Sequence, residues 1–279
     1  MSAAILAITN EFSIYSGSII FAAGVFGNIM NVLTFTQLKL FRENRFAFYL
    51  MIESICCFLF ILCNFIPTIL ISIYGDDGTT RSLIWCRLKT SLLQGFALTA
   101  NYVLCLVAVD QFFSTHYRYN LGQMCTLKLV RYLTIVFICL ILLYCTAFFL
   151  FYNIQPLIGC TVWNPIWLQY LTYFHYPVIA GLFPLTVTTL FGILSYRNVR
   201  RIVRRQLPIA RRRLDQQMTA MILSRIIVFL SMALPYNIFR IYTMNFPIVR
   251  SESISYAISR LVQTVFLAVA SLNFTVKFL

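Results

Sequence analysis

Few side chains in this sequence could carry out chemistry, and several of them gather in the stretch CLVAVDQFFSTHYRYN, residues 105–120. A long apolar run ends there in Asp110 and Gln111, and His116 and Arg118 follow at once. An enzyme would use a carboxylate and an imidazole of this kind for proton transfer. Catalysis also needs a nucleophile or a set of metal ligands in a defined arrangement, and none stands out in the sequence. We therefore expect that the chain is not an enzyme and holds neither a metal nor a cofactor.

The composition predicts that these residues belong to a membrane protein. Hydrophobic residues make up 60% of the 279 residues and charged residues 11%, with a mean hydropathy of +0.82. Soluble domains are only about 45–50% apolar and about 25% charged. A chain with this composition needs lipid, rather than water, around most of its surface.

Seven apolar blocks are each long enough for the roughly 20 helical residues that cross a bilayer. They cover about 13–38, 47–73, 83–110, 131–153, 171–196, 217–242 and 254–279. Lipid leaves the backbone of other open structures without hydrogen bonds, and the sequence lacks the alternating strands of a barrel. It thus predicts an all-α membrane protein, one domain over 1–279 that forms a seven-transmembrane helix bundle.

Charge predicts the orientation of this bundle. The first block lacks the basic start and the cleavage site of a signal peptide, so residues 1 to about 12 are expected to form a short tail. Basic residues gather in the loops after the first, third and fifth blocks, with eight arginines within 197–213. By the positive-inside rule the N-terminus is outside and the C-terminus is cytosolic, in a multi-pass protein of the plasma membrane. His116 and His175 then lie on opposite sides of the membrane.

The arginine-rich loop leaves two interpretations open. It could anchor the topology by facing anionic lipid, or it could be a docking face for a cytosolic partner. Binding to nucleic acid is disfavoured, because no folded nucleic-acid module surrounds the loop.

The cysteines test the predicted topology. Of the nine, Cys86 and Cys160 alone fall on the outer side, and the others lie in the blocks or in an inner loop. The outer compartment is oxidising, so a disulfide between these two is the natural inference. Two separate free thiols remain the alternative.

Several residues carry a family resemblance. They are Gly27-Asn28 in the first block, Cys86 and Asp110 in the third, Cys160 before the fifth, Phe183-Pro184 in the fifth, Phe229 and Pro235 in the sixth, and Asn273 in the seventh. In this register nearly the whole chain resembles the rhodopsin-like (class A) G-protein-coupled receptors. The segments LPYNIFRIY and VDQFFST are loosely similar to the divergent invertebrate branch with its FMRFamide-type neuropeptide receptors.

The resemblance assigns a role to the residues that end the third block. The family has Asp-Arg-Tyr there, and its arginine is held at rest and turns to the G protein on activation. This chain has Asp110-Gln111-Phe112, so the charged latch is lost and only hydrogen bonding remains. The resemblance implies that the residues for G-protein coupling are Asp110, Gln111, Phe112, Arg118, Arg200 and Arg204.

Further departures from the family concern the conformational switch. Cys57 stands where the family has a sodium-binding aspartate, Ala233 replaces the tryptophan of helix six, and Phe274 replaces the proline of helix seven. The switch residues implied by the resemblance are Asn28, Glu53, Arg225, Phe229, Pro235, Asn273 and Lys277. Ionisable groups in spans are usually paired, so we expect Glu53 to pair with Lys277 or Arg225. Alternatively, both cations could extend to the membrane interface.

The resemblance also places a ligand site in the outer half. The aspartate of aminergic receptors and the lysine of opsins are replaced by Leu93 and Leu267, which disfavours both ligand classes. A polar, basic cavity is expected, lined by Gln94, Tyr236, Asn237, Arg240, Arg260 and Gln263. It suits a peptide or another ligand that offers carboxylate or amide groups. The alternative is that several of these residues only anchor helix ends at the lipid headgroups.

Together these features predict a G-protein-coupled receptor whose partners are an extracellular ligand, with a neuropeptide favoured, a heterotrimeric G protein and the lipid bilayer. A chemosensory receptor for a small molecule is the alternative. A transporter is less favoured, because no internal repeats or broken helices are evident. The sequence ends at Leu279, so the eighth helix and tail of the family are expected to be absent, or the sequence is a fragment.

Overall fold

The computed structural model describes residues 1–37, 44–74, 78–115, 126–155, 159–202 and 254–275, and parts of 220–245. The helices are α1 (Ser2–Gln37), α3 (Arg45–Tyr74), α4 (Leu83–Thr115), α6 (Leu127–Phe151), α7 (Pro165–Tyr170), the π-helix η1 (Leu171–Leu182), α8 (Phe183–Ile202) and α10 (Ile254–Thr275). Residues 234–243 are also helical. Two short strands, β1 (Tyr152–Gln155) and β2 (Gly159–Val162), form an antiparallel hairpin after α6.

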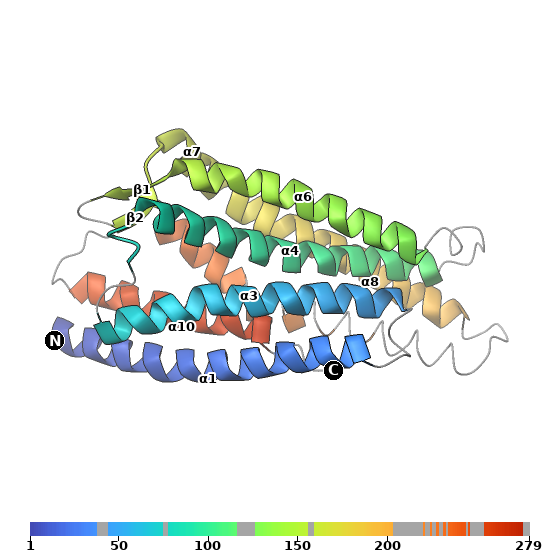
Figure 1. Ribbon diagram of the computed structural model, residues 1–279, viewed down its shortest axis with the longest axis horizontal. Helices are drawn as coiled ribbons and strands as arrows, with labels where there is room; N and C mark the ends of the chain where they lie inside the picture. The colour runs from blue at the N-terminus through green and yellow to red at the C-terminus, as the bar shows by residue number, and fades with distance from the viewer. Residues whose placement is uncertain are drawn as a thin grey trace.

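The long helices run side by side along the length of the molecule (Figure 1). Among the described residues, six helices are long and apolar enough to cross a membrane: 2–37, 45–71, 83–115, 127–151, 165–199 and 254–275. The chain is therefore a multi-pass helical membrane protein, as its composition predicts. The predicted sixth block, 217–242, is described only in part, and its last residues lie in the helix at 234–243.

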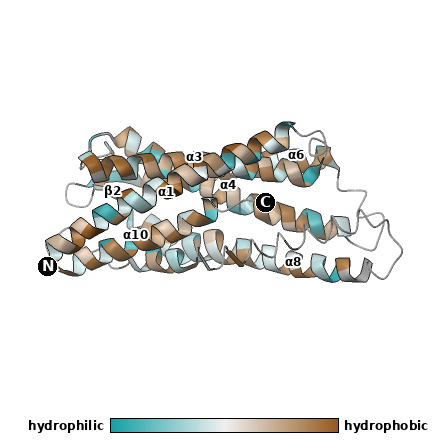
Figure 2. Cartoon of the chain, turned by 90° about the horizontal axis from the view of Figure 1, so that it is seen from below, coloured by the Kyte–Doolittle hydropathy of each residue, from teal (hydrophilic) through white to brown (hydrophobic). Residues whose placement is uncertain are grey.

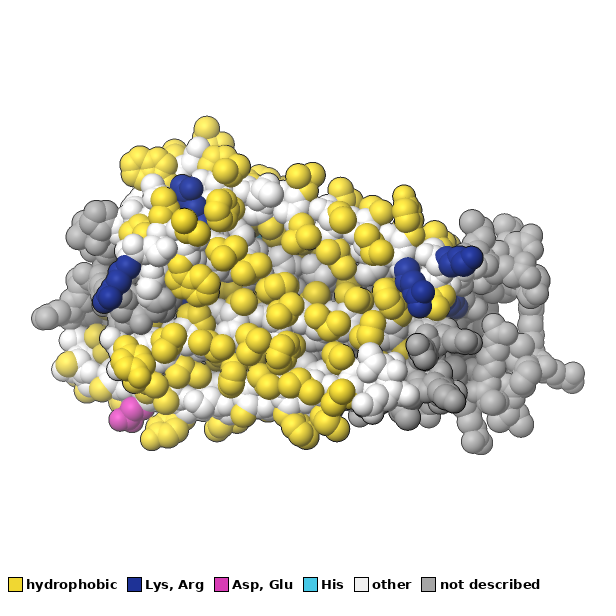
Figure 3. All heavy atoms as spheres, viewed as in Figure 1, with side chains coloured by type: hydrophobic (Ala, Val, Ile, Leu, Met, Phe, Trp, Pro, Cys, Tyr) yellow, Lys and Arg dark blue, Asp and Glu magenta, His cyan; other side chains and the backbone are white. Residues whose placement is uncertain are grey.

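Large apolar side chains face outward on these helices. Ile19 is 70% exposed and Leu143 is 69% exposed, which a soluble protein would avoid over a whole surface. Hydrophobic residues follow the full length of the helices (Figure 2). Figure 3 shows them covering the middle of the molecule, while described lysines and arginines lie near its two ends. This distribution is the one that an apolar layer with polar borders requires.

Several element boundaries differ from those the sequence predicts, and three of these differences bear on the interpretation. The helix α1 begins at Ser2, so residues 2–12 are helical and do not form a tail. The helix α4 continues past Asp110 to Thr115, so the carboxylate lies within the last turns of a helix and does not mark its end. The fifth block begins earlier than predicted, with α7 at Pro165.

Local hydrogen bonds explain several helix starts and the polar residues within apolar helices. The side chains of Asn44, Thr126 and Asn164 accept hydrogen bonds from backbone N–H groups at the starts of α3, α6 and α7. Inside the helices, threonine hydroxyls donate to the carbonyl four residues earlier, as Thr99 does to Gly95. A hydroxyl bonded in this way needs no water.

The helix α1 packs against α3 and α10 through a small residue and an amide. A Cβ at Gly24 would overlap the Ile61 side chain and approach the Thr275 hydroxyl, so glycine allows the close approach of the helices. One turn on, the Asn28 amide donates to the carbonyl of Gly24 at 2.8 Å and to that of Phe274 at 3.2 Å. The second bond joins the first helix directly to the last described one.

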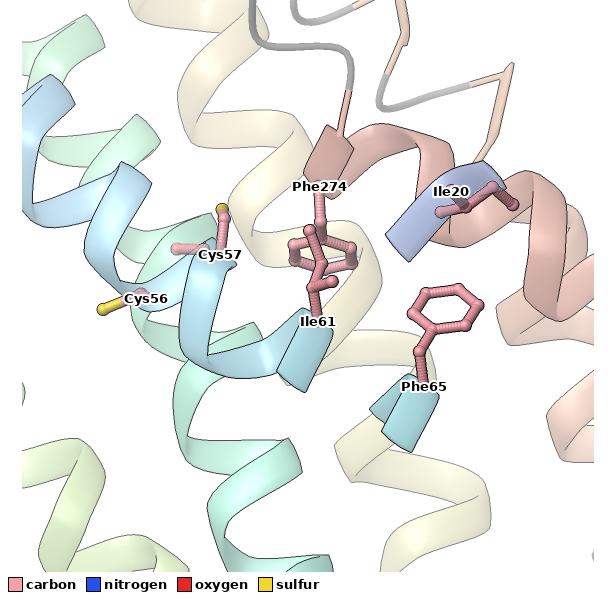
Figure 4. Close-up of a cluster of buried hydrophobic side chains, with 7 residues drawn as sticks. Ile20, Cys56, Cys57, Ile61, Phe65 and Phe274 are labelled. Carbon is pink, nitrogen blue, oxygen red and sulfur yellow. The ribbon is translucent and has the colours of Figure 1, made fainter. Parts of the chain in front are cut away.

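An apolar cluster lies beside this contact. It contains Cys57 and Ile61 from α3, Ile20 from α1 and Phe274 from α10. Figure 4 shows these side chains from three helices meeting in the interior. The ring of Phe274 stacks on Phe60 with centroids 4.2 Å apart. Two of the positions where the sequence departs from the family it resembles, Cys57 and Phe274, therefore belong to one hydrophobic cluster.

A disulfide fixes the hairpin at one end of the bundle. Cys86, at the start of α4, is bonded to Cys160 of β2, with Cα atoms 5.7 Å apart, which confirms the predicted pairing. Cys160 lies opposite Ile154, and Tyr152 opposite Val162, across the hairpin. Arg87, the residue after Cys86, donates from Nε to the Tyr152 carbonyl at 2.9 Å. The position of Tyr152 is thus set by a covalent bond and a hydrogen bond from the same helix.

The helix that follows the hairpin contains a wide turn that the sequence analysis did not predict. The π-helix η1 includes Pro177, which has no N–H to donate. A Cβ at Gly181 would come within 3.0 Å of the Tyr176 carbonyl, so the wide turn is closely packed there. Such π-turns are rare and are frequently found at functional sites. Tyr176, which is buried, lies within this π-helix.

We expect Asn28→Ala to lower the free energy of unfolding by about 1–3 kcal/mol, because the buried Phe274 carbonyl loses a donor from another helix. The control is Thr36→Ala, also on α1, whose exposed hydroxyl bonds only carbonyls of its own helix. Chemical denaturation of the purified proteins measures both. Equal stability of the two variants would show that the α1–α10 bond contributes nothing.

Replacing both Cys86 and Cys160 by serine should lower the free energy of unfolding by about 2–4 kcal/mol, because the unfolded chain gains freedom. The three tryptophans, at 85, 163 and 167, all lie near the hairpin, so their fluorescence reports on this end during heating. The matched control is Cys139→Ser, which removes an exposed free thiol. An unchanged melting curve in the double variant contradicts the expectation.

Candidate functional site

The helix α4 connects two polar sites at opposite ends of the bundle. Its start carries the Cys86 disulfide, and we call this the disulfide end. Asp110, in its last turns, pairs with Arg45, and we call this the ion-pair end. The helix packs against α3, α6 and α8 along its length and against the hairpin at its start. Both sites are therefore positioned by one helix.

At the ion-pair end, a guanidinium from another helix contacts the carboxylate predicted to act in coupling. Arg45 Nη1 donates to Asp110 Oδ1 at 2.9 Å. Arg45 is the first residue of α3, and the Asn44 side chain caps that helix immediately before it. The side chains are only 24% and 13% exposed, respectively, so water screens this pair less than a surface pair. The charge of Asp110 is thus balanced by α3 and not by its neighbour in sequence.

Gln111 lies inward beside this pair. It is 4% exposed, and its Nε2 has no hydrogen-bond partner among the described residues. Its backbone carbonyl accepts from the hydroxyls of Ser114 and Thr115. A buried amide with an unused donor is costly, so this side chain gains when a partner or water reaches it. Gln111 is therefore placed to respond to a change in its surroundings.

The other residues predicted for coupling are described only in part. The ring of Phe112 meets that of Phe191 in α8 edge-on, with centroids 5.4 Å apart. Arg200 lies in α8, but its side chain is outside the described residues, as are Arg118 and Arg204. Of the residues predicted for coupling, the structure thus describes three on α4 and only the helical position of Arg200 on α8.

The predicted switch residues that the structure describes lie inside the bundle. Asn28, Glu53 and Asn273 are buried, with exposures of 1%, 2% and 8%. Pro235 is half-buried in the helix at 234–243. Arg225, Phe229 and Lys277 lie outside the described residues, so the predicted pairing of Glu53 with Arg225 or Lys277 stays a prediction.

At the disulfide end, several predicted ligand residues gather around Arg240. Its guanidinium interacts electrostatically with the hydroxyls of Tyr152, Tyr176 and Tyr236. The Gln94 amide donates to the Tyr176 hydroxyl at 3.4 Å. Tyr152 and Tyr176 are both 4% exposed. We call these five side chains, from α4, the hairpin, η1 and the helix at 234–243, the tyrosine–arginine cluster.

The electrostatics of this cluster follow from its burial. Burial raises the pKa of the Tyr152 hydroxyl, the neighbouring Tyr176 adds to that rise, and the Arg240 guanidinium lowers it. The rise wins, so Tyr152 is a neutral phenol at physiological pH. Among the described residues, the groups that act most strongly on Arg240 are the hydroxyls of Tyr176, Tyr236 and Tyr152.

The remaining predicted ligand residues lie differently. Asn237 is half-buried and near the close packing at Gly181, where its amide would be 4.0 Å from an added Cβ. Gln263 is half-buried in α10, whereas Arg260 is exposed on that helix. Arg260 is not among the groups that act most strongly on Arg240.

Sequence reasoning missed three residues of these sites. Tyr152 and Tyr176 gave no signal, because a tyrosine in an apolar stretch is usually a packing residue. Arg45 was assigned only to the charge of a loop, since nothing in the sequence links it to Asp110, from which it is separated by 65 positions. A sequence feature that could have pointed to Tyr176 is Pro177, which disturbs the helix beside it.

A second polar contact at the disulfide end belongs to an aromatic core. The buried His175 shares a hydrogen bond of 2.7 Å between its Nδ1 and the Tyr144 hydroxyl, which also accepts from Tyr170. The rings of Phe148 and Trp167 pack around it. Among the described residues no group of three or more His, Cys, Asp or Glu side chains could hold a metal ion. This core is packed against the hairpin and holds Tyr152 in place.

No model of a known protein family matches the chain, and no curated protein matches its sequence.

Reversing either charge of the ion pair should destabilise the protein, because two like charges then lie side by side on side chains that are largely shielded from water. We expect Arg45→Asp and Asp110→Arg each to lower the free energy of unfolding by about 1–3 kcal/mol. The double variant should recover most of this loss. The control Lys128→Asp reverses an exposed charge near the start of α6. Additive losses in the double variant, measured by thermal unfolding, would show that the pair does not stabilise the fold.

Proposed function

We propose that this chain is a rhodopsin-like G-protein-coupled receptor that binds an extracellular ligand at the disulfide end and activates a heterotrimeric G protein at the ion-pair end. The observation that carries the proposal is the bond from Cys86 to Cys160, which ties the start of α4 to the hairpin before the fifth block. Cys86 and Cys160 are among the residues that carry the family resemblance, and the bond between them supports it. The plasma membrane, the outer N-terminus and a seventh span are parts of the same proposal.

The proposed signal passes between the two ends through helices that both sites share. Gln94 of the tyrosine–arginine cluster and Asp110 of the ion pair lie on α4, and Tyr176 and Phe191 lie on η1 and α8, which are continuous. A ligand that binds one arrangement of these helices better than another shifts the population toward it. The Arg45–Asp110 pair favours the resting arrangement and takes the place of the latch that Gln111 cannot form. The two-state element is the contact of α3 with α4 at that end.

A peptide is favoured as ligand because the tyrosine–arginine cluster offers several donors at once. A chemosensory receptor for a small molecule has the same support from this cluster, since one compact anion could satisfy it. The two differ in the size of the ligand that activates the receptor.

The test measures nucleotide exchange on each class of G protein, with the full chain in membranes and a library of peptides and small odorants as stimuli. Exchange driven by a peptide supports the proposal, and exchange driven only by small molecules favours the chemosensory alternative. Uptake of a solute into vesicles without exchange on any G protein would contradict both and favour a transporter.

Ligand-independent exchange provides a further prediction. Arg45→Gln removes the charge that holds Asp110, so it should raise basal exchange about fivefold if the pair contributes about 1 kcal/mol to the resting state. The control is Arg131→Gln, which removes an exposed charge from α6. Basal exchange that stays the same in both variants, at equal surface expression, would exclude the pair as the resting-state contact.

A further inference from the structure

Two large apolar side chains at the disulfide end are left uncovered by the described residues. Trp163 follows β2 and is 69% exposed, and Ile166 in α7 is 76% exposed. We call residues 163–166, which join the hairpin to α7, the corner. Apolar side chains this open to water are unfavourable next to one another, so a neighbouring pair of them marks a surface that something covers.

Two contacts place the corner level with the end of α6. The backbone N–H of Trp163 donates to the carbonyl of Phe151, the last residue of α6, at 3.3 Å. The ring of Trp167 in α7 stacks on the Phe151 ring with centroids 5.0 Å apart. Figure 1 shows α7 beside this end of α6. The corner is therefore fixed relative to a helix that is long and apolar enough to cross the membrane.

The length of α6 gives the position of the corner across the bilayer. From Arg131, an exposed cation near the other end of the helix, to Phe151 the helix extends roughly 30 Å at 1.5 Å per residue, which is the thickness of the hydrocarbon layer. Between them α6 carries exposed apolar side chains, with Leu143 69% and Leu150 63% exposed. A cation belongs at the border of this layer and not within it. Phe151 and the neighbouring Trp163 then lie at the opposite border.

The chemistry of the exposed side chains matches that border. An indole combines an apolar ring with one N–H donor, and tryptophan is enriched where acyl chains meet the lipid headgroups. The two tryptophans on either side of Ile166 differ in this respect. The indole nitrogen of Trp167 is buried and its ring stacks between Phe151 and Tyr170. Trp163 is open, and its indole N–H has no hydrogen-bond partner among the described residues.

We propose that Trp163 and Ile166 insert into the headgroup layer of the bilayer, so that the corner anchors the hairpin to the membrane surface at the disulfide end. The indole N–H donates to a phosphate or ester oxygen of a lipid, and the Ile166 side chain lies among the upper parts of the acyl chains. The lipid that covers the exposed face of α6 continues onto the corner. The proposal requires only that the chain crosses a membrane, and it does not depend on coupling to a G protein.

Local hydrogen bonds hold the corner in the shape that this contact needs. The Asn164 side chain accepts from the backbone N–H of Ile166 at 2.8 Å, which fixes the start of α7. Val162, the residue before Trp163, lies opposite Tyr152 across the hairpin. An anchor at Trp163 thus restrains the strand pair that carries Tyr152.

Fluorescence quenching tests the position of Trp163 in the purified full chain, held in nanodiscs of phosphatidylcholine. Trp85→Phe and Trp167→Phe together leave Trp163 as the only tryptophan of the sequence. Bromine atoms near the headgroup end of the lipid acyl chains should quench its emission about twofold more than bromine atoms near the chain ends, because the indole lies at the border. Equal or stronger quenching by the bromine atoms near the chain ends, or no quenching by either lipid, overturns the proposal.

A tryptophan placed deeper on α6 is the matched control. Leu143 lies about two turns before Phe151 and is exposed, so its side chain is nearer the middle of the bilayer. Leu143→Trp, in a chain whose three natural tryptophans are replaced by phenylalanine, should be quenched more by the bromine atoms near the chain ends. If this variant and the chain with Trp163 alone show the same order of quenching, the corner does not lie at the border and the proposal is wrong.

A second comparison decides the matter if the loss of Trp85 and Trp167 unfolds the protein. It uses the natural chain and Trp163→Phe, which changes an exposed side chain and leaves the aromatic core as it is. The quenching by bromine atoms near the headgroups that disappears in Trp163→Phe belongs to this indole. A clear loss supports the anchor, and identical quenching of the two proteins overturns it.

Discussion

The bond between Cys86 and Cys160 is the constraint on which the disulfide end depends. The hairpin is too short to fold alone, since two strands of four residues bury almost nothing. Held to α4, it brings Tyr152 over the helix bundle, where Arg87 fixes its carbonyl and Arg240 faces its hydroxyl. Arg240 in turn interacts with tyrosine hydroxyls, because the hairpin and η1 each bring a phenol to it. The covalent link therefore helps to hold Tyr152, one of the phenols beside this charge, in place.

The opposite end of α4, the ion-pair end, also contains a largely buried charge, and there an ion pair compensates it. Asp110 is mostly buried, and a carboxylate in such a place needs a cation or several donors. The neighbouring Gln111 carries no charge, so the cation must come from another helix, and Arg45 at the start of α3 supplies it. The pairing joins two helices, whereas a pair between adjacent residues would join none. It therefore couples the position of α3 to that of α4.

The sequence allows the helices to be predicted better than their contacts. Runs of apolar residues predict seven spans, because the bilayer fixes their length, and six of them appear as long apolar helices among the described residues. Cys86 and Cys160 could be paired because the oxidising compartment decides which thiols form a disulfide. Arg240 was named because the family resemblance places a ligand site in the outer half of the bundle. Its neighbours Tyr152 and Tyr176 were not, since the sequence predicted neither the hairpin that carries Tyr152 nor the π-helix η1 that carries Tyr176. Asp110 was found and its partner Arg45 was not, since nothing in the sequence links the two.

In the interior between the two ends, buried side chains either pack against apolar neighbours or form hydrogen bonds within the protein. Cys57 and Phe274 make this part of α3 and α10 apolar. A polar contact between α1 and α10 lies beside it, where the Asn28 amide donates to the backbone carbonyl of Phe274. A carbonyl bond depends on helix position and not on the partner's side chain. Sliding α10 along its axis would break it, whereas rotation of the Phe274 side chain would not. The α1–α10 contact is thus sensitive to helix translation, the kind of motion by which packed helices pass between discrete arrangements.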